Sequence, residues 1–391
     1  MISFENTETA FRHKTKASLR KAYWLFKLVG NPILVKIGKF KVNLALKLHI
    51  PIGWALRWNI FEQFCGGETI AECAQTTKVL DEYNVGTILD YSVEGKENEE
   101  DFEFTAAELH RTISTASGNA FIPFCVFKIS GISRLKLLEK VNAQKALTES
   151  EKREWKDVVS RVDALCKSAH DAQTPLFIDA EESWYQDAID ELANSMMEKY
   201  NTSGVFIYNT LQMYRHDRLE YLKKSLETAK SKGYQLGYKL VRGAYMEKER
   251  DRAEENGYPS PIQVNKAASD RDFNLALEFC CANIESISIC AGSHNEESAL
   301  QLVDLMEKNG IDKTDKRVYF AQLFGMSDHI SFNLSDAGYN VAKYVPYGPI
   351  REVIPYLIRR AEENTSVEGQ TSRELKLIQK EMKRRSNASS S

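Results

Sequence analysis

The stretch "LGYKLVRGAY", residues 236–245, combines the pattern of a buried strand with an unusual ending. Its apolar run carries Lys239 inside it and then breaks into arginine, glycine, alanine and tyrosine. Buried ammonium groups are costly unless they are paired or used in chemistry. The stretch therefore predicts a buried strand whose C-terminal end places positive charge in a functional site.

Short apolar runs of this kind recur from Gly86 onward, separated by longer amphipathic stretches. They read "GTILDY", "FCVFKIS", "PLFIDA", "GVFIYNT", "LGYKLV", "SISICA", "RVYFAQL" and "NVAKYVPYG". Eight alternations of strand and helix favour a closed barrel over an open doubly wound sheet. No G-x-G-x-x-G follows any run, so the usual signal of a dinucleotide-binding open sheet is missing.

These patterns predict an α/β fold, a (β/α)8 TIM-type barrel with an N-terminal helical arm and a final helix over the barrel mouth. We expect a basic helical arm over residues 1–85 and the barrel over residues 86–368. Residues 369–391 are expected to form a C-terminal helix that fades into a disordered, serine-rich tail.

Composition limits the classes of function. The 391 residues include 43% apolar residues and carry a net charge of −3, which argues against nucleic-acid binding.

Seven cysteines, scattered and never spaced as C-x-x-C, favour a reducing compartment and no structural metal. The N-terminus lacks the apolar core of a signal peptide, and no run approaches the ~20 apolar residues of a membrane span. We expect a cytoplasmic location, with peripheral contact at the inner membrane as an open question.

The N-terminal arm is strongly basic. Residues 1–60 hold eleven Lys and Arg residues against only Glu5 and Glu8. Between Arg20 and Arg57 these cations alternate with large apolar side chains. One interpretation is a helix on an anionic membrane surface, and the other is an arm packed on the main domain with its lysines in water. The sequence leaves both open.

A barrel of this type places its chemistry at the C-terminal ends of its strands. Every predicted strand ends in polar or charged groups: Glu94, Lys128, Asp179 with Glu181, Asn209, Lys239 with Arg242, Ser293 with His294, Gln322, and Tyr344. Any one of these residues alone could be a helix cap or a satisfied polar contact. The two lysines inside apolar runs are the strongest candidates for function.

A second cluster follows the last strand. The segment "PYLIRRAEEN" places Tyr356, Arg359 and Glu363 on one helical stripe, with Arg360 about 100° round from Arg359. Adjacent arginines usually form a solvated face, but these lie within an apolar run. Two guanidinium groups suit a carboxylate ligand.

Five motifs together resemble proline dehydrogenase, the FAD-dependent first enzyme of proline catabolism. They are "FIDAEE", "KLVRGAYMEKER", "GSHNEES", "YFAQLFGM" and "YVPYGPIREVIPYLIRRAEENTS". The likeness covers about residues 86–367 and is nearer to the monofunctional, mitochondrial-like branch than to the fused bacterial form.

The resemblance implies FAD held without a covalent bond across the barrel mouth. It implies that Asn209 contacts the flavin pyrimidine edge and that Lys239 approaches N5 and O4. Cations stabilise the charge that a flavin gains on reduction, and glycine allows close approach of the backbone. The other cofactor residues implied are Arg242, Gly243, Ala244, Ser293, His294, Gln322 and Glu363.

The resemblance also implies a pocket for L-proline, which is oxidised to 1-pyrroline-5-carboxylate by hydride transfer from C5 to the flavin, with a membrane quinone as the final acceptor. Lys128, Arg359 and Arg360 would bind the carboxylate, and Asp179 would lie beside the amine. Glu94 would pair with Arg359 and close the pocket, and Glu363 would orient Arg359. The ring would contact Tyr245, Leu323, Tyr344 and Tyr356, and the catalytic set is Asp179, Lys239 and Tyr344.

Three alternatives stay open at this point. A 4-hydroxyproline dehydrogenase is a near relative, although the ring of Tyr344 would occupy the space of a 4-hydroxyl group. A Schiff-base aldolase barrel could use Lys128 or Lys239. A catalytically inactive barrel could act as a binding partner.

Overall fold

The strands form a closed parallel barrel, which confirms the predicted fold class. The computed structural model describes residues 2–48, 53, 57–93, 96–366 and 370–388. Strand order around the barrel is β1-β2-β3-β4-β5-β6-β7-β8. The strands are β1 (Val85–Tyr91), β2 (Phe124–Phe127), β3 (Leu176–Ile178), β4 (Ile207–Gln212), β5 (Leu236–Val241), β6 (Ile287–Gly292), β7 (Val318–Leu323) and β8 (Val341–Tyr347).

Helices precede, separate and follow the strands. Before β1 lie α1 (Thr7–Phe11), α2 (Lys16–Val29), α3 (Pro32–Lys47), the π-helical turn η1 (Arg57–Phe61), α5 (Glu62–Phe64) and α6 (Ile70–Asp81). From β1 to β5 come α7 (Glu99–Ala116), the 3-10 turn η2 (Ile129–Gly131), α8 (Leu135–Asn142), α9 (Glu149–Asp171), α10 (Ser183–Tyr200) and α11 (Arg218–Lys232). After β5 come α12 (Met246–Asn256), α13 (Lys266–Ala282), α14 (Glu296–Lys308), α15 (Asp328–Asp336), α16 (Ile350–Ser366) and α17 (Gln370–Asn387).

The chain falls into two compact units. Unit 1 comprises Met1–Ser92 and Gln322–Ser391, and unit 2 comprises Val93–Ala321. One boundary lies just after β1 and the other within β7, so both units contain barrel strands. The division into arm, barrel and tail stays a prediction.

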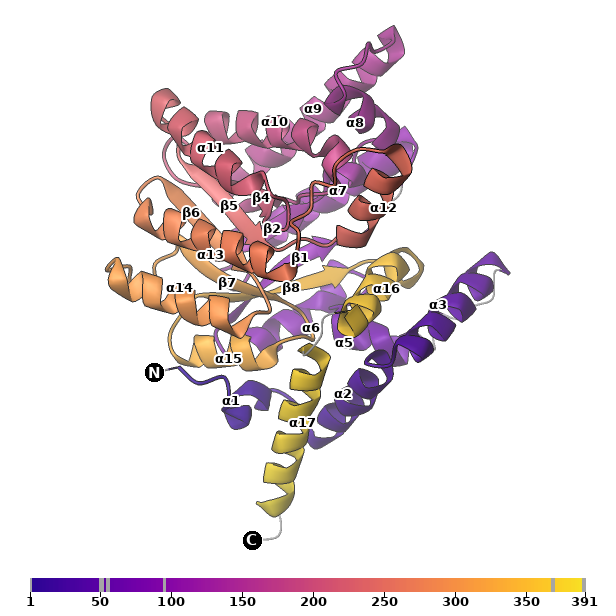
Figure 1. Cartoon of the computed structure of the whole chain (residues 1–391), viewed down its shortest axis with the longest axis vertical. Helices are drawn as coiled ribbons and strands as arrows, with labels where there is room; N and C mark the ends of the chain where they lie inside the picture. The colour runs from indigo at the N-terminus through magenta and orange to yellow at the C-terminus, as the bar shows by residue number, and fades with distance from the viewer. Residues whose placement is uncertain (1, 49–52, 54–56, 94–95, 367–369, 389–391) are drawn as a thin grey trace. The chain divides into compact units, whose positions relative to one another are not determined.

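Unit 2 contains the strands from β2 to most of β7, and Figure 1 shows α10, α11 and α13 beside β4, β5 and β6. Adjacent strands pair in parallel, for example Thr210 with Lys239 and Lys239 with Cys290. Parallel strands covered by helices are buried on both faces, which explains why β4 is buried along its whole length.

A cluster of four aromatic rings fills the interior of the barrel within unit 2. Phe124 of β2 stacks on Phe177 of β3 with 4.4 Å between ring centroids. Tyr319 of β7 meets Phe124 edge-on at 4.8 Å, and Tyr208 of β4 meets both phenylalanines at 5.4–5.5 Å. Rings from non-adjacent strands can meet only inside the barrel, so these residues mark the inner face of each strand.

Alternation along a strand then assigns every other position to one face or the other. On β4 the inner residues after Tyr208 are Thr210 and Gln212, so Asn209 faces the helix layer. On β5 a Cβ placed on Gly237 would lie 2.6 Å from the Tyr208 ring, so Gly237 and Lys239 face inward. The position of a residue in this alternation therefore decides whether its polar side chain faces the barrel interior or the helices.

Unit 1 is built around β1 and β8, which pair in parallel from Val85 with Val341 to Tyr91 with Tyr347. A hydrophobic core joins α1, α2 and η1 to α16 and α17, and it includes Phe11, Phe26 and Leu377. Of the two interpretations of the arm, packing on the rest of the protein therefore holds for α1 and α2 within unit 1. The C-terminal helix expected within residues 369–391 is present as α17, and the end of the serine-rich tail, residues 389–391, lies outside the described residues.

A buried ion pair fastens β8 to the helix layer of unit 1. Lys343 of β8 is fully buried, and its Nζ lies 2.9 Å from Oδ1 of Asp328 at the start of α15. His13 and Lys14 approach the other oxygen of Asp328 at 3.3 and 3.5 Å. Burial would raise the pKa of Asp328, but Lys343 and Lys14 outweigh it and hold that pKa well below its usual range.

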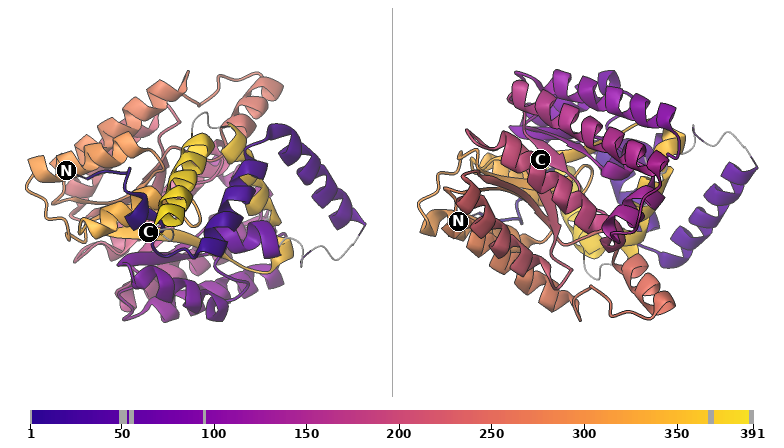
Figure 2. Two further views of the ribbon diagram at one scale, coloured as in Figure 1. Left: turned by 90° about the horizontal axis from the view of Figure 1, so that it is seen from below. Right: turned by 90° about the horizontal axis from the view of Figure 1, so that it is seen from above.

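Helix α3 differs from its neighbours because large apolar side chains on it face solvent, among them Ile33 and Phe40 at 68% exposure each. It contacts α2 and α16. Figure 2 shows α3 leading on from the end of α2 through a short turn. Within the described part of the chain, no helix is both long and apolar enough to cross a membrane.

Candidate active site

Three charged side chains meet at the strand ends of unit 2. Lys239 of β5 forms an ion pair with Asp179, the residue after β3. The Nζ of Lys128, the residue after β2, lies 3.7 Å from the other oxygen of Asp179. All three occupy inner positions, two or four residues after inward-facing aromatic or glycine residues. The structure thus brings together two predicted catalytic residues, Asp179 and Lys239, and the predicted carboxylate ligand Lys128.

The ion pair is largely removed from water, because the side chains of Lys239 and Asp179 are 7% and 12% exposed. The Lys239 ammonium group also lies 5.2 Å from the centre of the Phe177 ring. A carboxylate and an aromatic face both stabilise a buried cation. Within this trio two positive groups share one negative group, an arrangement suited to an anionic or electron-rich ligand.

Glu181 anchors the turn that follows Lys128. The Ser130 backbone N–H donates to Oε1 of Glu181 at 3.0 Å, and the Ser130 hydroxyl donates to Oε2. Burial raises the pKa of Glu181 to about 8, although the bonds from Ser130 oppose that rise. Glu181 therefore ties the end of β3 to the end of β2 and holds Lys128 in position.

Gln212 was missed by the sequence reasoning. It is the last residue of β4, and its Nε2 donates to the backbone oxygen of Glu181 at 2.7 Å. Its Oε1 accepts from the backbone N–H of Ala244 at 3.3 Å. Gln212 thus joins the ends of β3 and β5. The alternation that turns Gln212 inward, Tyr208 to Thr210 to Gln212, can be followed only once the structure shows that Tyr208 faces the interior.

The geometry does not support the flavin contact expected of Asn209. This side chain is fully buried on the outer face of β4, and its Nδ2 donates to Oδ1 of Asp190 on α10 at 2.9 Å. Its Oδ1 accepts from the backbone N–H of Thr210 at 2.8 Å. Asp190 in turn binds Arg218 of α11 at 2.7 Å. Asn209 therefore fastens the barrel to its helices.

Arg242 organises the ends of β5 and β6. Its Nε donates to Asp270 of α13 at 2.6 Å. Its two terminal nitrogens donate to Ser293 at 2.7 Å and to Ser298 at 2.9 Å. Burial would raise the pKa of Asp270, but hydrogen bonds from Lys266 and Arg242 lower it. The structure thus joins two predicted cofactor residues, Arg242 and Ser293.

Gly243 is required by its immediate surroundings. Its φ is +129°, a value that side-chain-bearing residues rarely adopt. A Cβ at this position would lie 2.4 Å from the Tyr214 ring. The neighbouring Ala244 is exposed, and Tyr245 and His294 are half-buried at the start of α12 and just after β6. The structure therefore adds a packing reason for the glycine to the cofactor reason suggested by the sequence.

The remaining predicted residues, apart from Glu94, lie in unit 1. Tyr344 is a buried residue of β8, paired with Ile88 of β1. Leu323 packs against the hydrophobic core of this unit. Gln322 accepts a hydrogen bond from the Ser331 hydroxyl at 2.7 Å, so part of its bonding capacity serves α15.

Helix α16 carries the predicted arginine cluster. The Arg360 guanidinium lies 5.0 Å from the centre of the Tyr356 ring, and both side chains are buried. Arg359 is half-buried on the adjacent face. Glu94 and the side chain of Glu363 lie outside the described residues, so their expected roles stay predictions.

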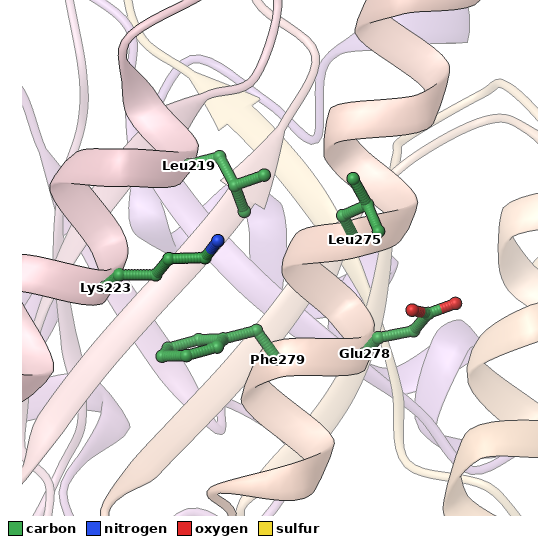
Figure 3. Close-up of a pocket in the computed structure, with 5 residues that line it drawn as sticks. All are labelled: Leu219, Lys223, Leu275, Glu278 and Phe279. Atoms are coloured by element: carbon green, nitrogen blue, oxygen red, sulfur yellow. The ribbon is translucent and has the colours of Figure 1, made fainter.

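A surface hollow of about 320 Å³ opens between α11 and α13 (Figure 3). Its walls come from the outer helices of unit 2, and it contains none of the predicted site residues. The lining residues are Leu219, Lys223, Leu275, Glu278 and Phe279. We assign no function to it.

A closed parallel barrel with charged side chains gathered at strand ends defines a (β/α)8-barrel enzyme. Residues 73–373 match the family described as proline dehydrogenase. The chain belongs to the proline dehydrogenase family, which confirms the resemblance read from the five motifs.

Two relatives and one solved structure illustrate the likeness. The chain is 32% identical to "Proline dehydrogenase 1, mitochondrial" of Dictyostelium discoideum, over 97% of this chain and 74% of that protein. It is 30% identical to "Hydroxyproline dehydrogenase" of Xenopus laevis, over 96% of this chain and 88% of that protein. The fold matches proline utilization A of Bdellovibrio bacteriovorus with a TM-score of 0.73 at 20% identity, over 92% of this chain and 38% of that one.

Proposed function

We propose that this protein oxidises L-proline to 1-pyrroline-5-carboxylate, with non-covalently bound FAD as the hydride acceptor and a membrane quinone as the final acceptor. Family membership supports the reaction class. The observation that carries the proposal is the trio of Lys128, Asp179 and Lys239 at the barrel strand ends.

The donor set of unit 2 fits FAD. Lys239 and Arg242 lie three residues apart at the end of β5, and Ser293 adjoins Arg242. Cationic and hydroxyl donors in this order suit a flavin ring followed by a pyrophosphate. We assign Lys239, Arg242, Gly243, Ala244, Ser293 and His294 to the cofactor. Bound FAD supplies the two-electron acceptor that the reaction requires.

The protein residues would bind and orient the substrate. Lys128, Arg359 and Arg360 are proposed to bind the carboxylate, and Asp179 to hold the ring nitrogen in place. Nearby ammonium groups disfavour a second positive charge, so they favour the neutral amine from which hydride can leave. The C5–H bond breaks with its electron pair, a C=N bond forms, and the nitrogen releases its proton to water. Positioning of C5 supplies much of the rate.

The test of this proposal is the visible spectrum of the purified protein before and after addition of L-proline. A flavin absorption band that bleaches with proline would support cofactor and substrate together. A colourless protein that takes up no FAD would overturn the proposal. Trapping of a lysine adduct by borohydride would instead support the aldolase alternative.

A second candidate is oxidation of 4-hydroxyproline, which the similarity to the Xenopus laevis protein favours. The bulk of Tyr344 argues for proline, since we propose that its ring packs against the substrate ring. Turnover of the two imino acids by the same preparation distinguishes them. We expect at least a tenfold preference in kcat/KM for L-proline.

A lipid-soluble acceptor requires the enzyme to meet a membrane. We therefore propose a peripheral position on the inner membrane, at its cytoplasmic face, with contact through residues 1–60. The absence of acidic residues between Glu8 and Glu62 supports this proposal.

A further inference from the structure

The exposed apolar residues of unit 1 are concentrated on two consecutive helices, α2 and α3. On α3 and the residue just after it, Ile33, Ile37, Phe40, Leu44 and Leu48 are 68%, 46%, 68%, 44% and 61% exposed. Monomeric proteins rarely leave contiguous apolar patches of this kind in water unless the patch binds something.

These five side chains form a single stripe. Their spacing of four, three, four and four residues keeps them within about 80° of one another on a helix with 3.6 residues per turn. Here we call this stripe, Ile33 to Leu48, the apolar face of α3. Leu34, which is 44% exposed, lies about 100° from Ile33 and widens the exposed apolar surface beside this stripe. A stripe this long is typical of a helix that lies in an interface.

The opposite side of α3 is the one that packs on the protein. Val35, about 200° from Ile33, lies partly buried against the hydrophobic core of unit 1. Lys39, near the same side, forms an ion pair with Glu362 of α16 at 2.6 Å. The helix is therefore already anchored through its other side, and the apolar face points away from α16.

Lysines border the apolar face on both sides. Lys36 and Lys47 project about 40–60° to one side of Ile33, and Lys41 projects about 80° to the other. All three are exposed. Because residues 9–61 contain no Asp or Glu, every charged side chain that α3 itself contributes is positive. This pattern complements an anionic surface with an apolar interior.

The end of α2 continues the same chemistry. Trp24 and Leu28, one helical turn apart, are 59% and 53% exposed. The ammonium group of Lys27 lies 5.0 Å from the centre of the Trp24 ring. Tryptophan with a neighbouring cation is favoured at the level of lipid headgroups.

We propose that the apolar face of α3, with its bordering lysines, binds an anionic phospholipid bilayer, with the helix lying in the plane of the interface. A second copy of this chain fits less well, because two such faces would bring lysine against lysine. The proposal rests on the membrane contact of the proposed function and deepens it by naming the face and the lipid chemistry.

The test uses the full chain with its cofactor and two kinds of vesicle, neutral phosphatidylcholine and phosphatidylcholine with about 30% phosphatidylglycerol. Phe40→Asp removes apolar contact at a site that is 68% exposed, so the fold should tolerate it. Lys36→Glu combined with Lys41→Glu reverses the bordering charge. Val264→Asp, at a site that is 87% exposed in unit 2, and Lys136→Glu are the matched controls.

We expect the unaltered protein to bind anionic vesicles at least tenfold more tightly than neutral ones, with weaker binding at high salt. Phe40→Asp and the double lysine variant should each lose at least tenfold on anionic vesicles, and both controls should match the unaltered protein. Equal binding to both vesicles, or full binding by Phe40→Asp, would overturn the proposal. So would a dimer in solution that Phe40→Asp abolishes and that binds no vesicles.

Oxidation of L-proline with a water-soluble dye separates this proposal from the proposed function. Dye reduction should be the same in all five proteins, because none of the substitutions touches the strand-end cluster. Normal dye reduction without vesicle binding would sink only the lipid proposal. Absence of dye reduction in the unaltered protein would sink the proposed function, whatever the vesicles show.

Discussion

The backbone N–H of Ser130 donates to the carboxylate of Glu181 at 3.0 Å, so the turn after β2 is held by the end of β3. Lys128 lies two residues before Ser130 and faces Asp179. The position of Lys128, which we propose binds the substrate carboxylate, therefore depends on the buried carboxyl group of Glu181. This arrangement makes Glu181 a positioning residue.

Glu181→Gln should remove a pH dependence of stability. The pKa of Glu181 is about 8 in the folded protein against an ordinary value of 4.5, so the folded state binds the extra proton between these values. Its contribution is fully present below about pH 4.5 and is lost as pH rises through about 8, at a rate of up to roughly 1.4 kcal/mol per pH unit. Urea unfolding at pH 5.5 and 7.5 measures the difference.

The exposed Glu149→Gln is the control for this prediction, because its side chain is 81% exposed. We expect its free energy of unfolding to follow the unaltered protein at both pH values. Identical pH slopes for Glu181→Gln and the unaltered protein would contradict the role given to burial.

Asp179→Asn should impair catalysis more than folding. The amide keeps the shape of the carboxylate but removes the charge shared by Lys128 and Lys239. We expect kcat/KM for L-proline to fall about 100-fold or more, since orientation and charge are lost together. Steady-state dye reduction measures this loss, and thermal unfolding checks that the fold survives. Asp187→Asn, on the exposed side of α10, should have no effect.

Asn209→Ala and Gln212→Ala should behave differently, although both residues belong to β4. The first leaves buried partners of Asn209 unsatisfied and should cost about 1–3 kcal/mol of stability while the KM for proline and the flavin content change less than twofold. The second frees the loop at Ala244 and should lower kcat/KM about tenfold. A large loss of flavin in Asn209→Ala would restore the cofactor contact expected from the sequence.

Gly243→Ala should cost more stability than Gly233→Ala. Both glycines have positive φ values, +129° and +79°, so both substitutions strain the backbone by about 1 kcal/mol or more. Only at Gly243 does the new Cβ meet a ring, that of Tyr214, whereas nothing lies within 4 Å at Gly233. We expect a further 1–3 kcal/mol from this overlap. Denaturant unfolding of the two variants gives the comparison, and equal losses would count against it.

Much of the fold could be predicted from the sequence because its signals are local. Apolar runs such as "FCVFKIS", with helical patterns between them, gave the strand and helix order, and eight alternations implied closure. The residue types at the strand ends pointed to Lys128, Asp179 and Lys239. The structure brings these three together because strands that run parallel in one barrel must end on the same side.

The face on which a side chain lies was decided only by the tertiary structure. Lys239 and Lys343 both interrupt apolar strands. Lys239 faces the barrel interior beside Asp179, whereas Lys343 faces the helix layer and binds Asp328, the first residue of α15. Asn209 and Gln212 differ in the same way. Strands that are buried on both faces show no alternation of apolar and polar residues. The sequence therefore identifies a buried barrel strand, but it does not show which alternate side chains face the interior. The face that points inward is set by the aromatic rings and helices that pack against each side of the strand in the closed barrel.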